Sequence, residues 1–266
     1  MRTVKIGKVD VSRLVTGGNP FSGFSHQGAA RDREMVRYYT VDRIKAALHR
    51  AEAAGVNTFF GRSDRHVTRM LMEYWDEGGK IQWFAQTASE LGDQIQAIKS
   101  AAAIGAKGVY LHGGVVDYWY AQKKFDLLKA AVQTMRECGV AGGLAGHPVE
   151  VHQWIRDNLD PDFQMCSYYD PSPRSENPHH VASLDEKWDD SHRDKMVALI
   201  QTITRPVVHY KVFAGGNKPV DAGFRYLATS MRPQDIVCIG HYLGDNENLF
   251  AENVKTFDAV VEKKAR

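Results

Sequence analysis

The chain has 266 residues, with 34 Lys and Arg against 32 Asp and Glu, a net charge of +2. Because the positive and negative charges nearly cancel, the chain lacks the strong net positive charge with which proteins bind nucleic acids or anionic membranes. Its three cysteines (Cys138, Cys166 and Cys238) form no C-x-x-C pair, which argues against a disulfide framework or a thiolate zinc site.

No apolar run approaches the roughly 20 residues that a membrane-spanning helix needs. The first 15 residues, MRTVKIGKVDVSRLV, have scattered charges and no apolar stretch of signal-peptide length. We therefore expect a cytoplasmic protein that binds a small molecule and neither nucleic acid nor membrane.

In chain order, eight short apolar runs bounded by Gly, Asn or His each precede a segment with helical periodicity. The expected strands are Leu14–Gly18, Asn57–Gly61, Ile81–Gln86, Gly108–His112, Ala141–Gly146, Phe163–Tyr168, Pro206–Ala214 and Asp235–Gly240. The expected helices are Thr40–Gly55, Asp64–Glu77, Gln94–Ile104, Phe125–Glu137, Val149–Leu159, Ser191–Ile203, Val220–Met231 and Glu247–Lys263.

The number of these units decides the fold class. Eight alternating units favour a closed barrel over a doubly wound sheet, and the length matches the usual size of about 250 residues. The sequence predicts one (β/α)₈ TIM-barrel domain over residues 1–266. The two long insertions, 19–40 and 170–190, both follow strands, so we expect them on the C-terminal rim, where barrels keep their chemistry.

Polar side chains stand at or just past nearly every strand end, where they converge on the mouth of the predicted barrel. They are Asn19, Arg62, Gln86, His112, His147, Tyr168, Asp170, Lys211 and His241. This ring is the candidate active site.

His112 and His147 end neighbouring strands, which lie about 4.8 Å apart in a sheet. Both imidazoles can therefore reach one point, as acid and base or as ligands of a divalent metal ion completed by Asp170, Asp64 or water. The alternative is that each ring hydrogen-bonds to a backbone carbonyl.

Lys211 lies in an apolar run, HYKVFAGG, where a buried ammonium is costly unless its pKa falls or it is paired. We expect it to face the mouth, where it can polarise a carbonyl, take a proton or form a Schiff base. The alternative is a structural pair with a carboxylate such as that of Asp170.

Glycines follow the last two strands, where barrels often bind phosphate through backbone N–H groups. Gly215, Gly216 and Gly240, with His241 and Asn248, are the candidate phosphate or cofactor residues. The alternative is that Gly215 and Gly216 only serve a turn with positive φ.

Aromatic residues in the rim segments are suited to stacking on a sugar, although they can also pack as lids. They are Phe21, Phe24, Tyr118, Trp119, Tyr120, Tyr168 and Tyr169. His179 and His180 lie in a polar segment, and we expect them on the surface.

Three regions of the chain carry recognisable motifs: VDVSRLVTGGNPFSG near the N-terminus, AAGVNTFFGRSDRHVTRML around the second expected strand, and KVFAGG with IVCIGHYLGDNENLFAENV near the C-terminus. They resemble, in that order, the N-terminal hairpin and first strand of the aldo-keto reductases, the segment with the catalytic Asp and Tyr of that family, and its cofactor-binding end. The resemblance implies a barrel with an N-terminal β-hairpin and the cofactor NADP.

The resemblance also implies a catalytic tetrad of Asp, Tyr, Lys and His, most of which this chain lacks. The Asp position falls on Phe60 or Gly61, and the Tyr position on Arg65 or His66. Gln86 stands where the Lys is expected, and only His112 matches. Because a reductase must deliver a proton to the developing alkoxide, this departure weakens the case for a conventional one.

The leading hypothesis is a lyase or isomerase acting on a small polyhydroxylated, sugar-derived carbonyl compound, with or without a metal ion. His112, His147 and Lys211 are its catalytic residues, and Asn19, Arg62, Gln86, Tyr168 and Asp170 bind the substrate. The alternatives are an NADP-dependent aldo-keto reductase with an altered proton donor and a non-catalytic barrel that binds a metabolite.

Overall fold

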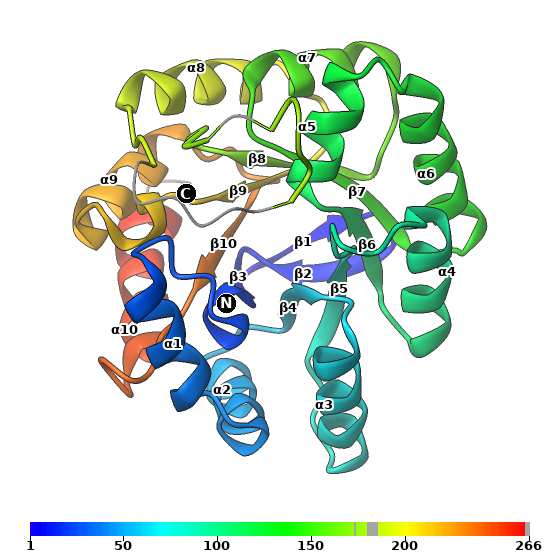
Figure 1. Ribbon diagram of the computed structural model, residues 1–266. Helices are drawn as coiled ribbons and strands as arrows, with labels where there is room; N and C mark the ends of the chain where they lie inside the picture. Colours follow the sequence, from blue (N-terminus) through cyan, green and yellow to red (C-terminus); the bar gives the residue numbers. More distant parts are fainter. Residues whose placement is uncertain (173, 180–185, 264–266) are drawn as a thin grey trace.

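The chain forms a closed barrel of eight parallel strands with helices around it (Figure 1). The computed structural model describes residues 1–172, 174–179 and 186–263. The barrel strands are β3 (Leu14–Gly17), β4 (Thr58–Arg62), β5 (Gln82–Gln86), β6 (Gly108–Leu111), β7 (Ala141–Gly146), β8 (Phe163–Ser167), β9 (Val207–Tyr210) and β10 (Ile236–Gly240). β10 pairs with both β9 and β3, which closes the ring and confirms the predicted fold class.

Ten α-helices are described. They are α1 (Ala29–Tyr38), α2 (Val41–Ala53), α3 (Arg65–Asp76), α4 (Gln94–Ile104), α5 (Gly113–Ala121), α6 (Phe125–Glu137), α7 (Val149–Asn158), α8 (Asp190–Ile200), α9 (Val220–Ser230) and α10 (Leu249–Phe257). Thr40 caps α2 by accepting a hydrogen bond from the backbone N–H of Arg43, as its sequence predicts. Within the described residues, no helix has the length and apolar character that crossing a membrane requires.

A hairpin of β1 (Thr3–Ile6) and β2 (Val9–Ser12) covers the N-terminal end of the barrel. The backbone N–H of Ser12 donates to Asn57 Oδ1 at 2.8 Å, just before β4 begins. Ile6 and Val11 are fully buried in the barrel interior. The mouth at the other end therefore remains the accessible end of the barrel.

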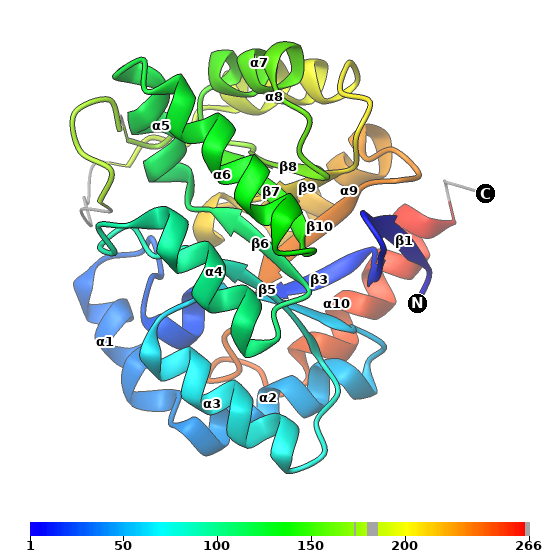
Figure 2. The ribbon, with the colours of Figure 1, turned by 90° about the vertical axis from the view of Figure 1, so that its right-hand side faces the viewer.

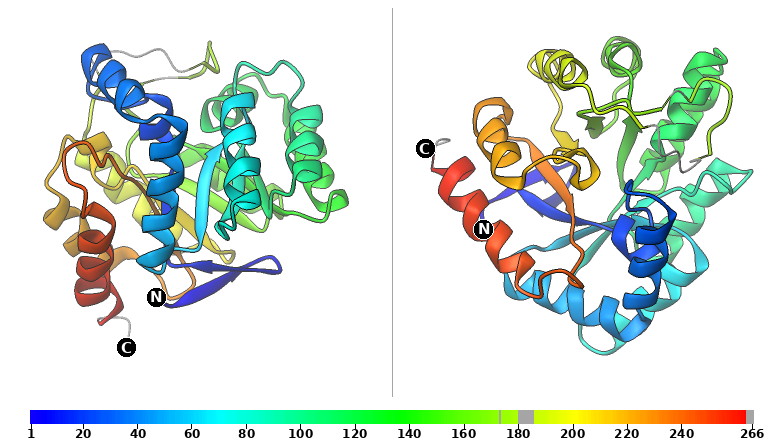
Figure 3. Two further views of the ribbon diagram at one scale, coloured as in Figure 1. Left: turned by 90° about the horizontal axis from the view of Figure 1, so that it is seen from below. Right: turned by 60° about the vertical axis from the view of Figure 1, so that its left-hand side comes forward.

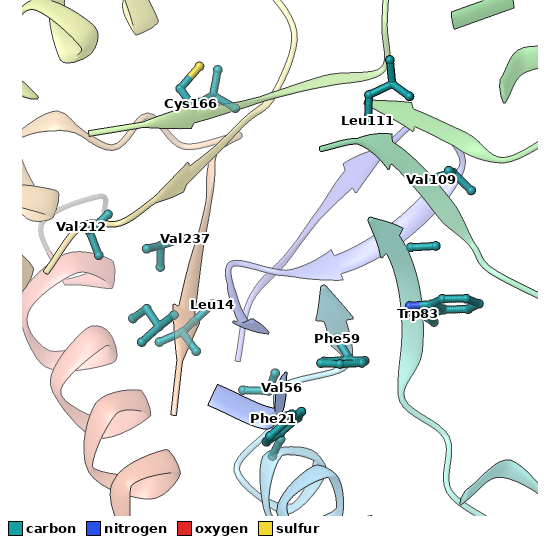
Figure 4. Close-up of a cluster of buried hydrophobic side chains, with 14 of the residues drawn as sticks. Leu14, Phe21, Val56, Phe59, Trp83, Val109, Leu111, Cys166, Val212 and Val237 are labelled. Carbon is teal, nitrogen blue, oxygen red and sulfur yellow. The ribbon is translucent and has the colours of Figure 1, made fainter. Parts of the chain in front are cut away.

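Alternating side chains build two apolar layers. Phe60 points inward and stacks on Phe84 with ring centroids 4.8 Å apart, whereas Phe59 points outward. Figure 4 shows the outer layer, in which residues such as Phe59 and Trp83 pack between the strands and the helices. The filled interior gives the mouth a solid floor.

The described parts of both insertions lie at the rim, opposite the hairpin (Figures 2 and 3). The first contains α1, a helix that the sequence analysis did not anticipate. A second unexpected helix, α5, contains Tyr118, Trp119 and Tyr120, which the sequence analysis placed in a loop. Strand β9 also ends earlier than expected, at Tyr210, so that Lys211 begins a turn with φ +55°.

Candidate active site

A cavity of about 780 Å³ opens at the C-terminal mouth of the barrel. This volume falls in the range of small-molecule sites, about 300–1,000 Å³. Its floor is formed by side chains of the barrel interior: Phe60, Tyr110, Met165 and Cys238. Of the residues predicted for the site, Asn19, Arg62, Gln86, His112, His147, Lys211, Gly215, Gly216 and Gly240 line the cavity.

His112 lies directly after β6 and caps α5. Its ring Nδ1 accepts a hydrogen bond of 3.1 Å from the backbone N–H of Gly114. Since Nδ1 is the acceptor, the neutral ring carries its proton on Nε2. His112 therefore presents a hydrogen-bond donor at the cavity wall.

His147 is the centre of a chain of buried polar groups. Its Nδ1 is 2.7 Å from Asp117 Oδ2, and its backbone N–H donates to Asp117 Oδ1. On the other side, its Nε2 is 3.2 Å from the hydroxyl of Tyr210, which donates to the carbonyl of Gly146. Asp117 lies on α5 and Tyr210 ends β9, so three elements meet at this chain.

The surroundings of this chain favour neutral groups. Burial raises the pKa of Asp117 well above its ordinary value, and burial lowers the pKa of His147 well below its own. The nearby Lys211 and Arg174 also lower the pKa of His147. Both shifts favour the uncharged forms, a protonated Asp117 and a neutral imidazole at His147.

Lys211 stands in a left-handed turn right after Tyr210. Burial, with the neighbouring guanidinium of Arg174, lowers the pKa of Lys211 to about 7. Its Nζ lies 5.7 Å from the ring centroid of Trp188. A positive φ at a lysine costs about 1–3 kcal/mol, and such strain is concentrated at functional sites.

Arg62 and Arg31 are each paired at the rim. Arg62 contacts Asp64 and Glu90 and lies over the ring of Phe24 at 5.1 Å. Arg31 contacts Glu34 and Asp245. The guanidinium of Arg62 still lines the cavity, where it can bind a substrate hydroxyl.

The two insertions meet above Lys211. His26 Nδ1 lies 3.0 Å from Glu186, and Gln27 Nε2 donates to the carbonyl of Gly215. Gly215 and Gly216 have φ of +62° and +87°, and the N–H of Gly216 donates to Phe213 inside the turn. These contacts favour the alternative reading of the two glycines, that they shape a turn.

Three predicted site residues lie away from the cavity. The Tyr168 hydroxyl bonds to His209 and Ser230 among the outer residues. His241 is fully buried, where it stacks on Phe250 with ring centroids 4.1 Å apart. Asn248 precedes α10, and none of the three lines the cavity.

Asp170 and the aromatic residues need a similar correction. Asp170 does not line the cavity, although its carboxylate acts electrostatically on Lys211. Among the predicted aromatic residues only Phe24 is in the lining; Phe21 and Tyr169 are buried. His179 lines the rim and is exposed, and His180 lies outside the described residues.

The described side chains lend no support to the predicted metal site. Both ring nitrogens of His147 have protein partners, Asp117 and Tyr210, and Nδ1 of His112 accepts from Gly114. In the described part of the chain, no group of three or more His, Cys, Asp or Glu side chains is placed to hold a metal ion. This donor set does not fit a divalent metal ion shared by His112 and His147.

The cavity extends to the β10–α10 segment, through Tyr242, Asp245, Asn246 and Leu249. NADP would need cations for its phosphates here. The cation on this side of the described lining is Arg31, which is paired with Asp245 and Glu34 and stacks on Tyr242 at 4.4 Å. As arranged, these residues do not fit the phosphates of NADP.

Sequence reasoning missed Asp117, Arg174 and Tyr210. Asp117 is the only charged residue in the apolar segment GGVVDYWY, and that isolation was the available signal. Tyr210 follows from alternation, since Val208 two residues earlier points into the barrel. Nothing in the sequence marks Arg174, which lies in the second insertion and is 6% exposed.

No protein-family model matches the chain, and no curated protein matches it. Solved structures do match. A putative aldo-keto reductase from Pseudomonas aeruginosa has a TM-score of 0.62 at 16% identity, over 98% of this chain and 94% of that one. An aldo-keto reductase from Bacillus halodurans, in its holo form, has a TM-score of 0.58 at 12% identity, over 100% and 96%.

A truncated 3-deoxy-D-arabino-heptulosonate 7-phosphate synthase from Thermotoga maritima also matches, with a TM-score of 0.58 at 14% identity over 99% of this chain and 94% of that one. At such identities the likeness concerns the fold alone. The chain therefore has the aldo-keto reductase-like form of the TIM barrel, in agreement with the resemblance seen in its sequence.

Proposed function

We propose that this aldo-keto reductase-like barrel is an enzyme that moves protons on a small polyhydroxylated carbonyl compound, as a lyase or isomerase does. The observation that carries the proposal is Lys211, an amine in the cavity wall whose pKa is about 7. At neutral pH about half of such amines are unprotonated. Lys211 is therefore matched to taking a proton from the carbon next to a carbonyl.

His112 is the partner of Lys211 in this reaction. As the carbon loses its proton, negative charge develops on the carbonyl oxygen and must be stabilised. The Nε2–H of His112 supplies a hydrogen bond to that oxygen. Asn19, Arg62 and Gln86 line the same cavity and can bind the substrate hydroxyl groups.

The second candidate is an NADP-dependent reductase with an altered proton donor. It is supported by the fold, because the matching structures from Pseudomonas aeruginosa and Bacillus halodurans are described as aldo-keto reductases. The comparisons favour this candidate over the first. The residues of the site favour the first, because the tetrad is largely missing and Arg31 is already paired on the β10–α10 side of the cavity.

Hydrogen exchange in D₂O tests the first candidate without knowledge of the product. Small polyhydroxylated aldehydes and ketones are incubated with the enzyme, and loss of the proton beside the carbonyl is followed by NMR. We expect exchange with at least one compound, and a loss of 10²-fold or more in Lys211→Met. Lys195→Met, at an exposed position on α8, is the matched control.

Titration with NADPH, followed by nicotinamide fluorescence, separates the two candidates. We expect no saturable binding at micromolar concentrations. Tight binding together with carbonyl-dependent NADPH oxidation would make the chain a reductase. Binding of a carbonyl compound without exchange or oxidation would make it a non-catalytic metabolite-binding barrel.

A further inference from the structure

The chain of Asp117, His147 and Tyr210 has no role in the steps given to Lys211 and His112. A lyase that eliminates a hydroxyl group from a polyhydroxylated carbonyl compound must also protonate a second oxygen, that of the leaving hydroxyl, which then departs as water. Tyr210 lines the cavity next to Lys211 in the chain, and its hydroxyl is the end of the buried series.

We propose that Tyr210 protonates this second oxygen and that the proton is replaced from Asp117 through His147. The inference rests on the proposed function for its substrate. The geometry behind it is the series of short contacts, 2.7 Å from Asp117 to His147 and 3.2 Å from His147 to Tyr210.

We call Asp117, His147 and Tyr210 the relay. Its hydrogen-bond pattern matches the state before transfer, in which each of the three groups holds the proton that it will pass on. The Tyr210 hydroxyl donates to the carbonyl of Gly146, so that it can accept a hydrogen bond from the Nε2–H of His147. With its proton on Nε2, His147 offers Nδ1 as an acceptor to a protonated Asp117. Burial raises the pKa of Asp117 and lowers that of His147, which stabilises the same state.

The transfer balances without any further reactant. Tyr210 gives its hydroxyl proton to the substrate oxygen and takes the Nε2 proton of His147. His147 takes the proton of Asp117 at Nδ1. One proton has then left the protein, Asp117 is a carboxylate, and both His147 and Tyr210 are neutral again.

The charged neighbours suit this cycle. Arg174 and Lys211 both lower the pKa of Asp117, whereas Asp170 raises it. Arg174, and Lys211 once it has taken the substrate proton, therefore stabilise the carboxylate that the transfer creates, while burial favours the protonated acid beforehand.

The backbone packs closely around the relay. A Cβ atom at Gly113 would lie 2.9 Å from Cε1 of His147 and 3.3 Å from the Tyr210 hydroxyl. A Cβ atom at Gly146 would lie 3.1 Å from Asp117 Oδ1. Two glycines thus allow the three polar side chains to meet, in well-packed surroundings that fix their distances.

Infrared spectroscopy tests the state of Asp117 without a substrate. We expect the wild-type protein at neutral pH to show the C=O stretching band of a protonated carboxyl, and Asp117→Asn to lack it. The matched control is Asp170→Asn, since burial also raises the pKa of Asp170. ¹⁵N NMR of His147 should place its proton on Nε2. An ionised Asp117 in the wild type would overturn the proposal.

Turnover tests the delivery step. Asp117→Asn keeps the contacts, because the amide can donate to Nδ1 of His147 and accept from its backbone N–H, but it has no acidic proton to give. We expect a 10²-fold loss of turnover in Tyr210→Phe and at least a tenfold loss in Asp117→Asn, each with little change in KM.

The two proposals fail in different ways. If the wild-type enzyme catalyses no hydrogen exchange in any of the carbonyl compounds, the proposed function is wrong whatever the infrared spectrum shows. If exchange depends on Lys211 while Tyr210→Phe turns over at the wild-type rate, the relay is wrong and the proposed function stands.

Discussion

His112 has two tasks, and an asparagine can perform one of them. Its Nδ1 caps α5 by accepting from the N–H of Gly114, and Asn is a good residue at such a cap. Its other task is to donate from Nε2–H to the carbonyl oxygen, and an Asn whose Oδ1 caps the helix has no N–H at that position. We expect His112→Asn to lower the exchange rate 10²-fold or more with little change in melting temperature.

The comparison variant for this prediction is His112→Ala, which removes the cap as well and should cost about 1 kcal/mol of stability. If His112→Asn keeps its rate but melts lower, the histidine is a structural residue and has no part in the chemistry.

Gln86 occupies the position where the resemblance places the lysine of a reductase. It ends β5 and lines the cavity. Gln86→Lys alone should create no reductase activity, because the acidic and phenolic members of the tetrad are missing and such residues act as a unit. NADPH-dependent turnover of a carbonyl compound in this single variant would contradict that view.

The strands were the most predictable elements, and the directions of single side chains within them were the least. Buried parallel strands appear as short apolar runs, so their ends could be located within a few residues. Tyr168 was misplaced because its direction depends on alternation along β8. Phe163 and Met165 point into the barrel, which turns residue 168 outward.

Two helices were missed for physical reasons. Half of the residues of α1 are charged and the helix buries only Met35, so it shows no apolar face to recognise. α5 begins with Gly113 and Gly114, which indicate a turn rather than a helix. Asp117 lies on this missed helix, and the relay was missed with it.

The N-terminal hairpin contributes to stability at the end of the barrel away from the site. Ile6 is fully buried in the barrel interior. Ile6→Ala should lower the free energy of unfolding by about 2–5 kcal/mol, as the midpoint of urea unfolding would show. The fraction of the Ile6→Ala variant that is folded should catalyse hydrogen exchange in the substrate at the wild-type rate. Lys8→Ala, in the exposed turn of the hairpin, should stay within about 0.5 kcal/mol.

At the scale of the whole molecule, the buried side chains of the outer apolar layer form a single cluster, whose members come from all parts of the chain between Leu14 and Val261. We therefore propose that the chain unfolds as one domain, with coincident transitions in tryptophan fluorescence and far-UV circular dichroism. Two separated transitions would show that more than one unit folds here.

The pH dependence of exchange follows from Lys211. An amine acts as a base only when unprotonated, and the pKa of Lys211 is about 7. The exchange rate should rise as the pH increases through about 7 and fall below it. A lysine with an ordinary pKa, about 10.4, would place this rise far higher.

The whole account depends on that one amine, and its titration can be measured directly. In protein labelled with ¹³C at the lysine ε carbons, the Lys211 signal is assigned by its absence from Lys211→Met and followed by NMR as the pH is raised. The account predicts a midpoint near 7, several units below the ordinary value for a lysine side chain. A midpoint above 10 would mean that Lys211 is a permanent cation, and the proposed base of the reaction would not exist.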